Sequence, residues 1–464
     1  MQKIKIIDLL QKISNSDIER LSELINSSNN LKPKIIPLYN EIIKNLQQPQ
    51  KNTKENLWKM LFGKLAINDG LFRKLCFDLL QRVEQCISII EMENSKHDSQ
   101  LYLMQYYKNN NNEDFFEDRW QKTKAEIQCQ SLISSKQLFN DYSLELMQYD
   151  FLTSNPLRSK KNNIIDTSNS LDEYYVLQKL KLLCHAINES KFTNYNMLPA
   201  FDEYIIRMAE NKSLQKNTLI SLYLDIYQLM KYEDTKDAFI SVKRKLQTLD
   251  SIDESESRII FQYLINYCII ELNKGRSIYE AELFIIYKTY VEKINDKTIS
   301  PFRFKNIINV ALKQKQFDFA AYFIDEFGKK LPSEHQQISI AFSKAKLQYE
   351  IKNYDTVISI LQNVKNEDLT FNLSSKVLIV KTFYEKKEFQ FLESFLESFR
   401  IFILRNKEMN TASKKIHQDF IKIIHRLIKM EFASAREIEL FKSKINNNNN
   451  LPDKAWILEK LEAI

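Results

Sequence analysis

A short helix–turn–helix pattern recurs along this chain and limits its fold more than any other feature. Three twelve-residue windows carry the pattern: KQKQFDFAAYFI from Lys313, EIKNYDTVISIL from Glu350 and EKKEFQFLESFL from Glu385. In each window an aromatic residue closes the turn, a small or aliphatic residue follows three positions later, and an aliphatic residue follows four positions after that. In order, these residues are Phe317, Ala320 and Ile324; Tyr354, Val357 and Leu361; and Phe389, Leu392 and Leu396.

The spacing of these turns indicates a repeat architecture. Phe317 and Tyr354 lie 37 residues apart, and Tyr354 and Phe389 lie 35 apart. Weaker turns near Phe192, Thr235 and Tyr279 extend the series upstream. Helix pairs repeating at such intervals are typical of α-solenoids, in which stacked neighbours complete the hydrophobic core. We predict an all-α protein, an α-solenoid of antiparallel helix pairs; the alternative is a single irregular helical bundle whose turns look alike.

Glycine and proline support an almost wholly helical chain. The 464 residues include 4 glycines, where average usage would give roughly 32. Glycine supplies the positive φ angles of hairpin turns and phosphate-binding loops, so many of either are excluded. The 8 prolines lie between apolar-periodic segments or near the start of one, where a helix accepts proline.

The organisation of the pattern changes along the chain. Residues 1–152 read as an irregular α-helical N-terminal region, and the polar segment 153–170 reads as a linker. Helix–turn–helix units then follow over 171–431, and we expect 432–464 to form C-terminal capping helices.

In the windows above, the sequence resembles the tetratricopeptide-repeat family. The acidic-aromatic turns NYD and QFD, the small Ala320 and the closing Pro332 carry the resemblance. It implies a superhelix that binds peptides in the concave groove formed by the first helix of each pair. The layout of the whole chain also looks like a group of bacterial helical-repeat proteins, a resemblance that implies no activity.

Six residues are candidates for this groove. Lys346 and Lys381 occupy equivalent repeat positions, and each is followed three residues later by a tyrosine on the same helix face. One repeat earlier, Lys305 and Asn309 have a spacing that resembles half of the family's clamp for a C-terminal carboxylate. The candidates are Lys305, Asn309, Lys346, Tyr349, Lys381 and Tyr384. Such a groove would suit an extended or helical acidic segment; the alternative is solvated lysines beside packing tyrosines.

A basic stripe provides a second functional hypothesis. Four cations lie along one face of the predicted helix at 412–430, opposite its apolar residues: Lys415, Lys422, Arg426 and Lys429. The stripe at 415–429 could contact nucleic-acid phosphates, as in a helical regulator, or it could be a solvated face. The net charge of +7 is a mild excess, and a dedicated nucleic-acid domain usually has a denser basic face.

The sequence offers no set of residues for catalysis. It contains no phosphate loop, no Cys-x-x-Cys and no His-Glu-x-x-His, so we assign no catalytic, cofactor-binding or metal-ligating residue and no cofactor. Cys184 reads as core, and the five widely spaced cysteines read as reduced thiols. We therefore expect a cytoplasmic, non-enzymatic scaffold for a protein or peptide partner, with nucleic acid disfavoured and no membrane partner.

Overall fold

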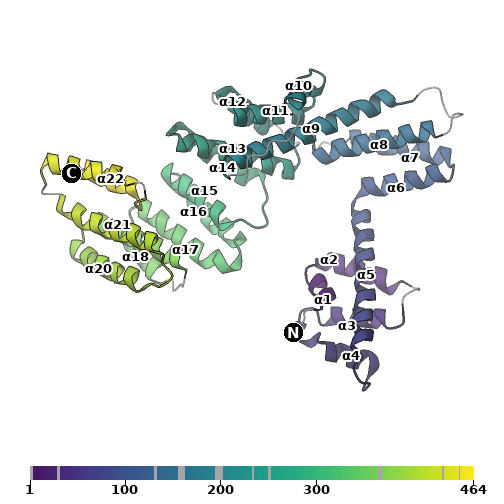
Figure 1. The fold of residues 1–464 in the computed structure, drawn as a ribbon, viewed down its shortest axis with the longest axis horizontal. Helices are drawn as coiled ribbons and strands as arrows, with labels where there is room; N and C mark the ends of the chain where they lie inside the picture. Colours follow the sequence, from purple (N-terminus) through teal and green to yellow (C-terminus); the bar gives the residue numbers. More distant parts are fainter. Residues whose placement is uncertain are drawn as a thin grey trace. The chain divides into compact units, whose positions relative to one another are not determined.

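The computed structural model confirms that the protein is all-α (Figure 1). It describes residues 4–28, 32–129, 133–154, 162–193, 202–232, 235–248, 252–363, 368–430, 433–448 and 450–464. Over these ranges there is no β-strand; a single isolated β-bridge joins Ile133 to Ile252. No helix in the described ranges is long and apolar enough to cross a membrane.

The chain forms two compact units. Unit 1 comprises Met1–Lys231 and Gln247–Asp253, and unit 2 comprises Tyr232–Leu246 and Glu254–Ile464. The helices that begin in unit 1 are α1 (Lys5–Leu10), α2 (Asn15–Asn26), α3 (Ile35–Lys44), η1 (Pro49–Lys51), α4 (Lys54–Phe62), α5 (Asp69–Asn94), α6 (Lys96–Asn109), α7 (Glu113–Gln128), α8 (Ser135–Thr153), α9 (Ile164–Ser190), α10 (Asp202–Ala209), η2 (Leu214–Lys216) and α11 (Thr218–Lys231).

Unit 2 begins with α12, whose last residues are assigned to unit 1. Its helices are α12 (Lys236–Thr248), α13 (Glu254–Asn273), α14 (Ile278–Lys293), α15 (Pro301–Lys313), α16 (Phe317–Phe327), η3 (Gly328–Lys330), α17 (Ser333–Glu350), α18 (Tyr354–Asn363), α19 (Leu369–Glu385), α20 (Phe389–Arg405), α21 (Thr411–Lys429), α22 (Ala435–Asn446) and α23 (Lys454–Glu462). The last two lie within the segment 432–464.

The recurring pattern marks the starts of α16, α18 and α20. Phe317, Tyr354 and Phe389 are the first residues of these helices. The small and aliphatic residues that follow them in the pattern are all buried, as the repeat predicts: Ala320, Ile324, Val357, Leu361, Leu392 and Leu396.

Lysine, and not glycine, takes the left-handed conformation at these turns. Lys315, Lys352 and Lys387 have φ angles of 55°, 63° and 56°. After each, a backbone N–H closes the helix by bonding a carbonyl five residues earlier, as Asn353 does with Gln348 at 2.8 Å. This bond satisfies one of the carbonyls that a helix end leaves free. Few glycines therefore do not mean few tight turns.

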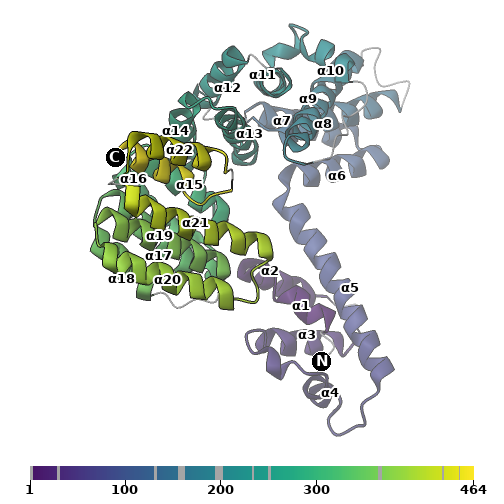
Figure 2. The same ribbon diagram turned by 60° about the vertical axis from the view of Figure 1, so that its left-hand side comes forward.

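Helices of unit 2 pack on their neighbours in sequence. The second helix of each pair contacts the first helix of the next: α16 with α17, α18 with α19 and α20 with α21 (Figure 2). The first helices also contact one another, α15 with α17 and α17 with α19. Side-chain caps fix where first helices begin; Ser300 accepts the Arg303 N–H before α15, and Asp368 accepts the Phe371 N–H before α19.

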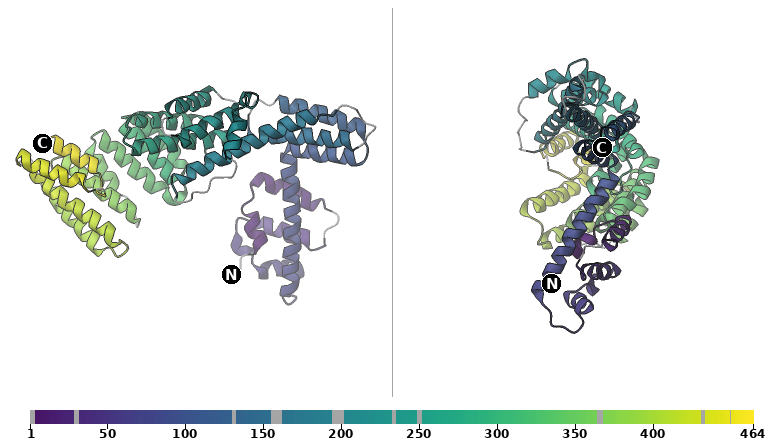
Figure 3. Two further views of the ribbon diagram at one scale, coloured as in Figure 1. Left: turned by 45° about the horizontal axis from the view of Figure 1, so that its top comes forward. Right: turned by 90° about the vertical axis from the view of Figure 1, so that its right-hand side faces the viewer.

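In unit 1, α1, α2 and α3 pack against the long helix α5 (Figure 3). The linker predicted at 153–170 is wrong over its last seven residues, because α9 begins at Ile164. Residues 155–161 of that segment lie outside the described ranges. The predicted linker also falls inside unit 1, and the chain divides later, around 232–253.

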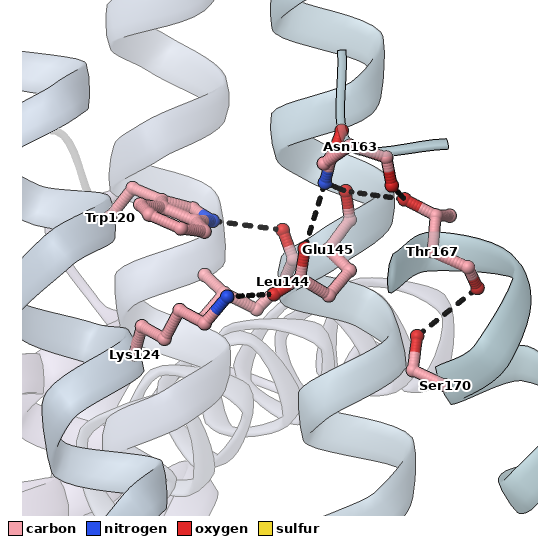
Figure 4. A network of polar contacts seen from close by, with 7 residues as sticks. All are labelled: Trp120, Lys124, Leu144, Glu145, Asn163, Thr167 and Ser170. Carbon is pink, nitrogen blue, oxygen red and sulfur yellow. Dashed lines mark hydrogen bonds and ion pairs between the residues drawn. The ribbon is translucent and has the colours of Figure 1, made fainter. Parts of the chain in front are cut away.

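A buried polar network explains why polar residues begin α9 (Figure 4). Glu145 is 2% exposed, and its carboxylate accepts hydrogen bonds from Lys124 Nζ at 2.7 Å and Asn163 Nδ2 at 2.8 Å. Asn163 and Thr167 also donate to the Glu145 carbonyl, at 2.9 and 3.3 Å. The polar sequence that reads as a linker therefore secures α9 to α8.

Candidate functional site

Five of the six candidate residues line one groove in unit 2. The groove has a volume of about 990 Å³ and lies among α15, α17, α19 and the C-terminal helix α23. The five are Lys305, Asn309, Lys346, Tyr349 and Lys381. The sixth, Tyr384, packs behind it, with its ring centroid 5.3 Å from that of Trp456.

Equivalent positions on consecutive first helices bring these side chains together. Asn309 lies on α15 and Lys346 on α17, 37 residues later, and the two helices are in contact. Lys346 Nζ donates a hydrogen bond to Asn309 Oδ1 at 3.0 Å. The same step from α17 to α19 places Lys381 Nζ 4.7 Å from the Tyr349 ring centroid. Successive first helices therefore contact one another along the groove, through one hydrogen bond and one contact between a cation and a ring.

Lys346 is a half-buried cation that forms no ion pair with a carboxylate of the described residues. Among the described residues, its ammonium group contacts the Asn309 amide and lies 5.4 Å from the Phe342 ring centroid. Burial lowers the pKa of Lys346 to about 8; the carboxylates of Asp453 and Glu350 oppose this change, while Lys305 and Lys381 add to it. Each of those two lysines disfavours the charge on Lys346, because like charges repel. An anion in the groove would relieve this repulsion.

Lys381 is already paired within the chain. Its Nζ lies 3.0 Å from Asp453 Oδ2, and its side chain is only 12% exposed. The Tyr349 and Trp456 rings flank it, with the Trp456 centroid 5.6 Å away. Lys346 and Lys381 are thus equivalent in the repeat but differ in availability, because α23 covers only the second.

Glu385 attaches α23 to the first helices. Its carboxylate accepts hydrogen bonds from Trp456 Nε1 at 2.7 Å and Tyr349 OH at 3.2 Å, and it lies 2.8 Å from Lys460 Nζ. Burial by itself would raise the pKa of Glu385, but hydrogen bonds from Lys460 and Trp456 outweigh it and hold the pKa below its ordinary value. Buried Trp456 and Ile457 then join the core of α19 to α22.

The remaining charged groups leave the groove with a surplus of unpaired cations. Lys305 and Lys352 are exposed, and their side chains form no hydrogen bond or ion pair with the described residues. Lys313, in contrast, lies 3.0 Å from Glu280. The acid Glu350 also borders the groove, and burial raises its pKa against the opposing effect of Lys381 and Lys346.

The basic stripe lies on α21, and all four of its cations are exposed: Lys415, Lys422, Arg426 and Lys429. Lys422 has an acid nearby, Asp419, at 3.5 Å. The Arg426 guanidinium lies over the Phe441 ring, 4.6 Å from its centroid. The opposite face packs into the core through Phe420, Ile424 and Leu427. The stripe is therefore an accessible but partly compensated basic face.

The sequence did not point to Asp453, Trp456, Glu385 or Lys460. Trp456 and Glu385 lie 71 residues apart, so no local spacing could connect them. The only signal is an apolar pattern in the terminal segment, which indicates a helix but not the surface against which it packs.

Other parts of the chain provide less chemistry. A second groove, of about 860 Å³, lies in unit 1 between α1 and α5, and its charged border contains both signs, such as Lys5 and Asp8. Over the described ranges no three His, Cys, Asp or Glu residues lie close enough to hold a metal ion. Cys184 is buried, as expected of a core residue, and burial raises the pKa of its thiol.

Comparison of the chain with family models, with curated proteins and with solved structures finds no match. The tetratricopeptide-repeat resemblance thus rests on the residues that carry it, and function has to be argued from the groove.

Proposed function

We propose that unit 2 is a tetratricopeptide-like α-solenoid that binds a protein or peptide in the groove along its first helices, without catalysing a reaction. The partner carries acidic side chains or a free carboxylate toward Lys346 and Lys305. One observation supports this most strongly: Lys346 is half-buried and lines the groove, and among the described residues its ammonium group contacts an amide and a ring but forms no ion pair. A buried ammonium group without a counter-ion is costly, and a bound anion offsets that cost.

The aromatic residues along the groove support a peptide over a free ion. Phe342, Tyr349 and Trp456 line it together with the lysines. Grooves of this kind combine apolar pockets for side chains with a few polar groups that fix orientation. A small anion would use the cations and leave this apolar surface empty.

A peptide array of acidic sequences, followed by fluorescence anisotropy on the strongest binders, tests the proposal. We expect Lys305→Glu and Lys346→Met each to weaken binding about tenfold, the usual size of a charge contact at a binding site. Lys288→Glu is the matched control, because Lys288 is exposed on α14 and does not line the groove. Equal loss with the control, or no acidic binder at all, would reject the groove.

A second candidate function is contact with nucleic acid through the basic stripe on α21, which rests on the exposure of its four cations. A gel shift across a salt series tests this function, since phosphate contacts weaken steeply as salt rises. We expect Lys415→Glu with Lys429→Glu to abolish any shift. Absence of binding at low salt removes this candidate and leaves the groove untouched.

A further inference from the structure

The connection between α4 and α5 in unit 1 can be followed in Figure 2, and it carries aliphatic side chains that are exposed to solvent. Leu65 is 66% exposed and Ile67 43%. Met60, near the end of α4, and Leu71, at the start of α5, are also exposed. We call these four residues the apolar tip. Single exposed aliphatic residues are normal on protein surfaces, but several close together indicate a contact surface.

The backbone beneath the apolar tip is fixed by hydrogen bonds. Trp58, buried in the core of α1 to α5, donates from Nε1 to the Leu65 carbonyl at 2.9 Å. The Asn68 side chain caps α5 by accepting the Leu71 N–H at 2.9 Å. Gly63, with φ of 66°, makes the turn that leaves α4. Leu65 and Ile67 are therefore held outward by an ordered loop.

Basic residues lie next to the apolar tip in the sequence. Lys59, Lys64, Arg73 and Lys74 are exposed, and none of their side chains forms a hydrogen bond or ion pair with the residues that the structure describes, although Arg73 is near enough to Asp69 to lower the pKa of that carboxyl. The two acids between residues 51 and 74 are Glu55 and Asp69, and Asp69 is paired with Lys54. The tip thus combines aliphatic side chains with a surplus of positive charge, carried by Lys59, Lys64 and Lys74.

This combination selects among possible partners. Protein interfaces are depleted in lysine, and their aromatic enrichment has no counterpart among the four residues of the tip. A second copy of the chain would bring like charges together. Nucleic acid would pair with the cations but would leave the exposed leucine and isoleucine side chains without an apolar contact. An anionic lipid surface accommodates both parts: aliphatic side chains enter the headgroup boundary, and lysines lie near the lipid charges.

We propose that the apolar tip docks unit 1 on a membrane surface rich in anionic phospholipid. Leu65 and Ile67 enter the interface, and Lys59 and Lys64 contact the headgroups. Such docking needs no spanning helix, so it agrees with the helices described above, although the sequence predicts no membrane partner. It is also independent of the groove in unit 2.

Flotation of the full chain with vesicles tests the proposal, using phosphatidylcholine alone or mixed with phosphatidylserine. We expect binding to the mixed vesicles only, decreasing as salt rises. Leu65→Ser with Ile67→Ser, and separately Lys59→Gln with Lys64→Gln, should each reduce binding about tenfold or more. Ile278→Ser with Leu404→Ser is the matched control, because both residues are exposed and lie in unit 2.

The outcomes separate the membrane from other partners. Circular dichroism should show unchanged helicity in every variant, because all the substituted side chains are exposed. Binding that is equal for both vesicle types, or unaffected by the two serines at the tip, would overturn the proposal. Capture on polyglutamate beads without vesicle binding would also overturn it, in favour of an acidic protein partner.

Discussion

At the scale of single residues, the turns of unit 2 carry backbone strain, which glycine at the same positions would avoid. Lys315, Lys352 and Lys387 adopt φ angles between 55° and 63°, a region that costs an ordinary residue about 1–2 kcal/mol. Lysine is tolerated there because its side chain is exposed and the backbone bonds closing each helix remain intact. The pattern of turns is thus retained without glycine.

Substitution at Lys352 tests this account. Glycine relieves the left-handed strain but loses more entropy on folding, so we expect Lys352→Gly to raise the free energy of unfolding by up to about 1 kcal/mol. Lys352→Val, at the same position, should lower it, because a β-branched residue fits positive φ poorly. Chemical denaturation followed by circular dichroism measures both. A loss of stability with glycine would contradict the assigned turn.

Lys346 gives the groove a pH dependence. Because burial holds its pKa at about 8, we expect affinity for an acidic peptide to fall as pH rises through 8, well below the pH near 10 at which an ordinary lysine loses charge. The sign for stability is opposite. Between pH 8 and the pKa of 10.5 that Lys346 has in the unfolded chain, the unfolded chain keeps the Lys346 proton and the folded chain loses it. The free energy of unfolding therefore rises with pH in this range.

Lys346→Met serves as the reference for both effects. Anisotropy from pH 7 to 9.5 should show a decrease in affinity for the native chain and a nearly flat profile for the variant. Denaturation over the same range should show that the free energy of unfolding of the native chain increases with pH relative to that of the variant. A native profile parallel to that of Lys346→Met would mean that Lys346 keeps an ordinary pKa.

At the scale of elements, α23 depends on one carboxylate. Glu385 is bonded to Trp456 and Lys460 on α23 and to Tyr349 on α17. We expect Glu385→Leu to cost about 2–4 kcal/mol of stability, because it leaves several partly buried donors without an acceptor. Glu385→Gln should cost less, since the amide retains one acceptor oxygen.

The acid dependence follows from the same group. The folded-state pKa of Glu385 is held below 4.5, so its contribution is complete above about pH 4.5 and is lost as pH falls through the folded value. Exposed Glu393, on α20, provides the matched control as Glu393→Gln. Thermal unfolding near neutral pH measures the loss. Equal unfolding temperatures for Glu385→Leu and Glu393→Gln would mean that α23 is held by its apolar residues alone.

At the scale of the whole molecule, the parts that the sequence predicts are those set by local periodicity. The aromatic turn residues mark the starts of α16, α18 and α20, and the 37-residue spacing places Lys346 beside Asn309. Contacts between segments that are distant in the sequence produce no periodic pattern of residues. Three features are therefore visible only in the structure: the side of the groove formed by α23, the bonds from Asn163 to Glu145, and the division into units near residues 232–253.

The two units should unfold as separate transitions, because each has its own buried clusters. Leu396→Ala removes a fully buried side chain from the cluster of α19 to α23, and we expect a loss of about 2–5 kcal/mol confined to unit 2. In unit 1, Leu38→Ala removes an equally buried residue from the cluster of α1 to α5. Differential scanning calorimetry on both variants should show one transition lowered in each case and the other unchanged. A joint shift would show that the two cores unfold as one cooperative system, as in an array whose neighbouring interfaces couple along its whole length.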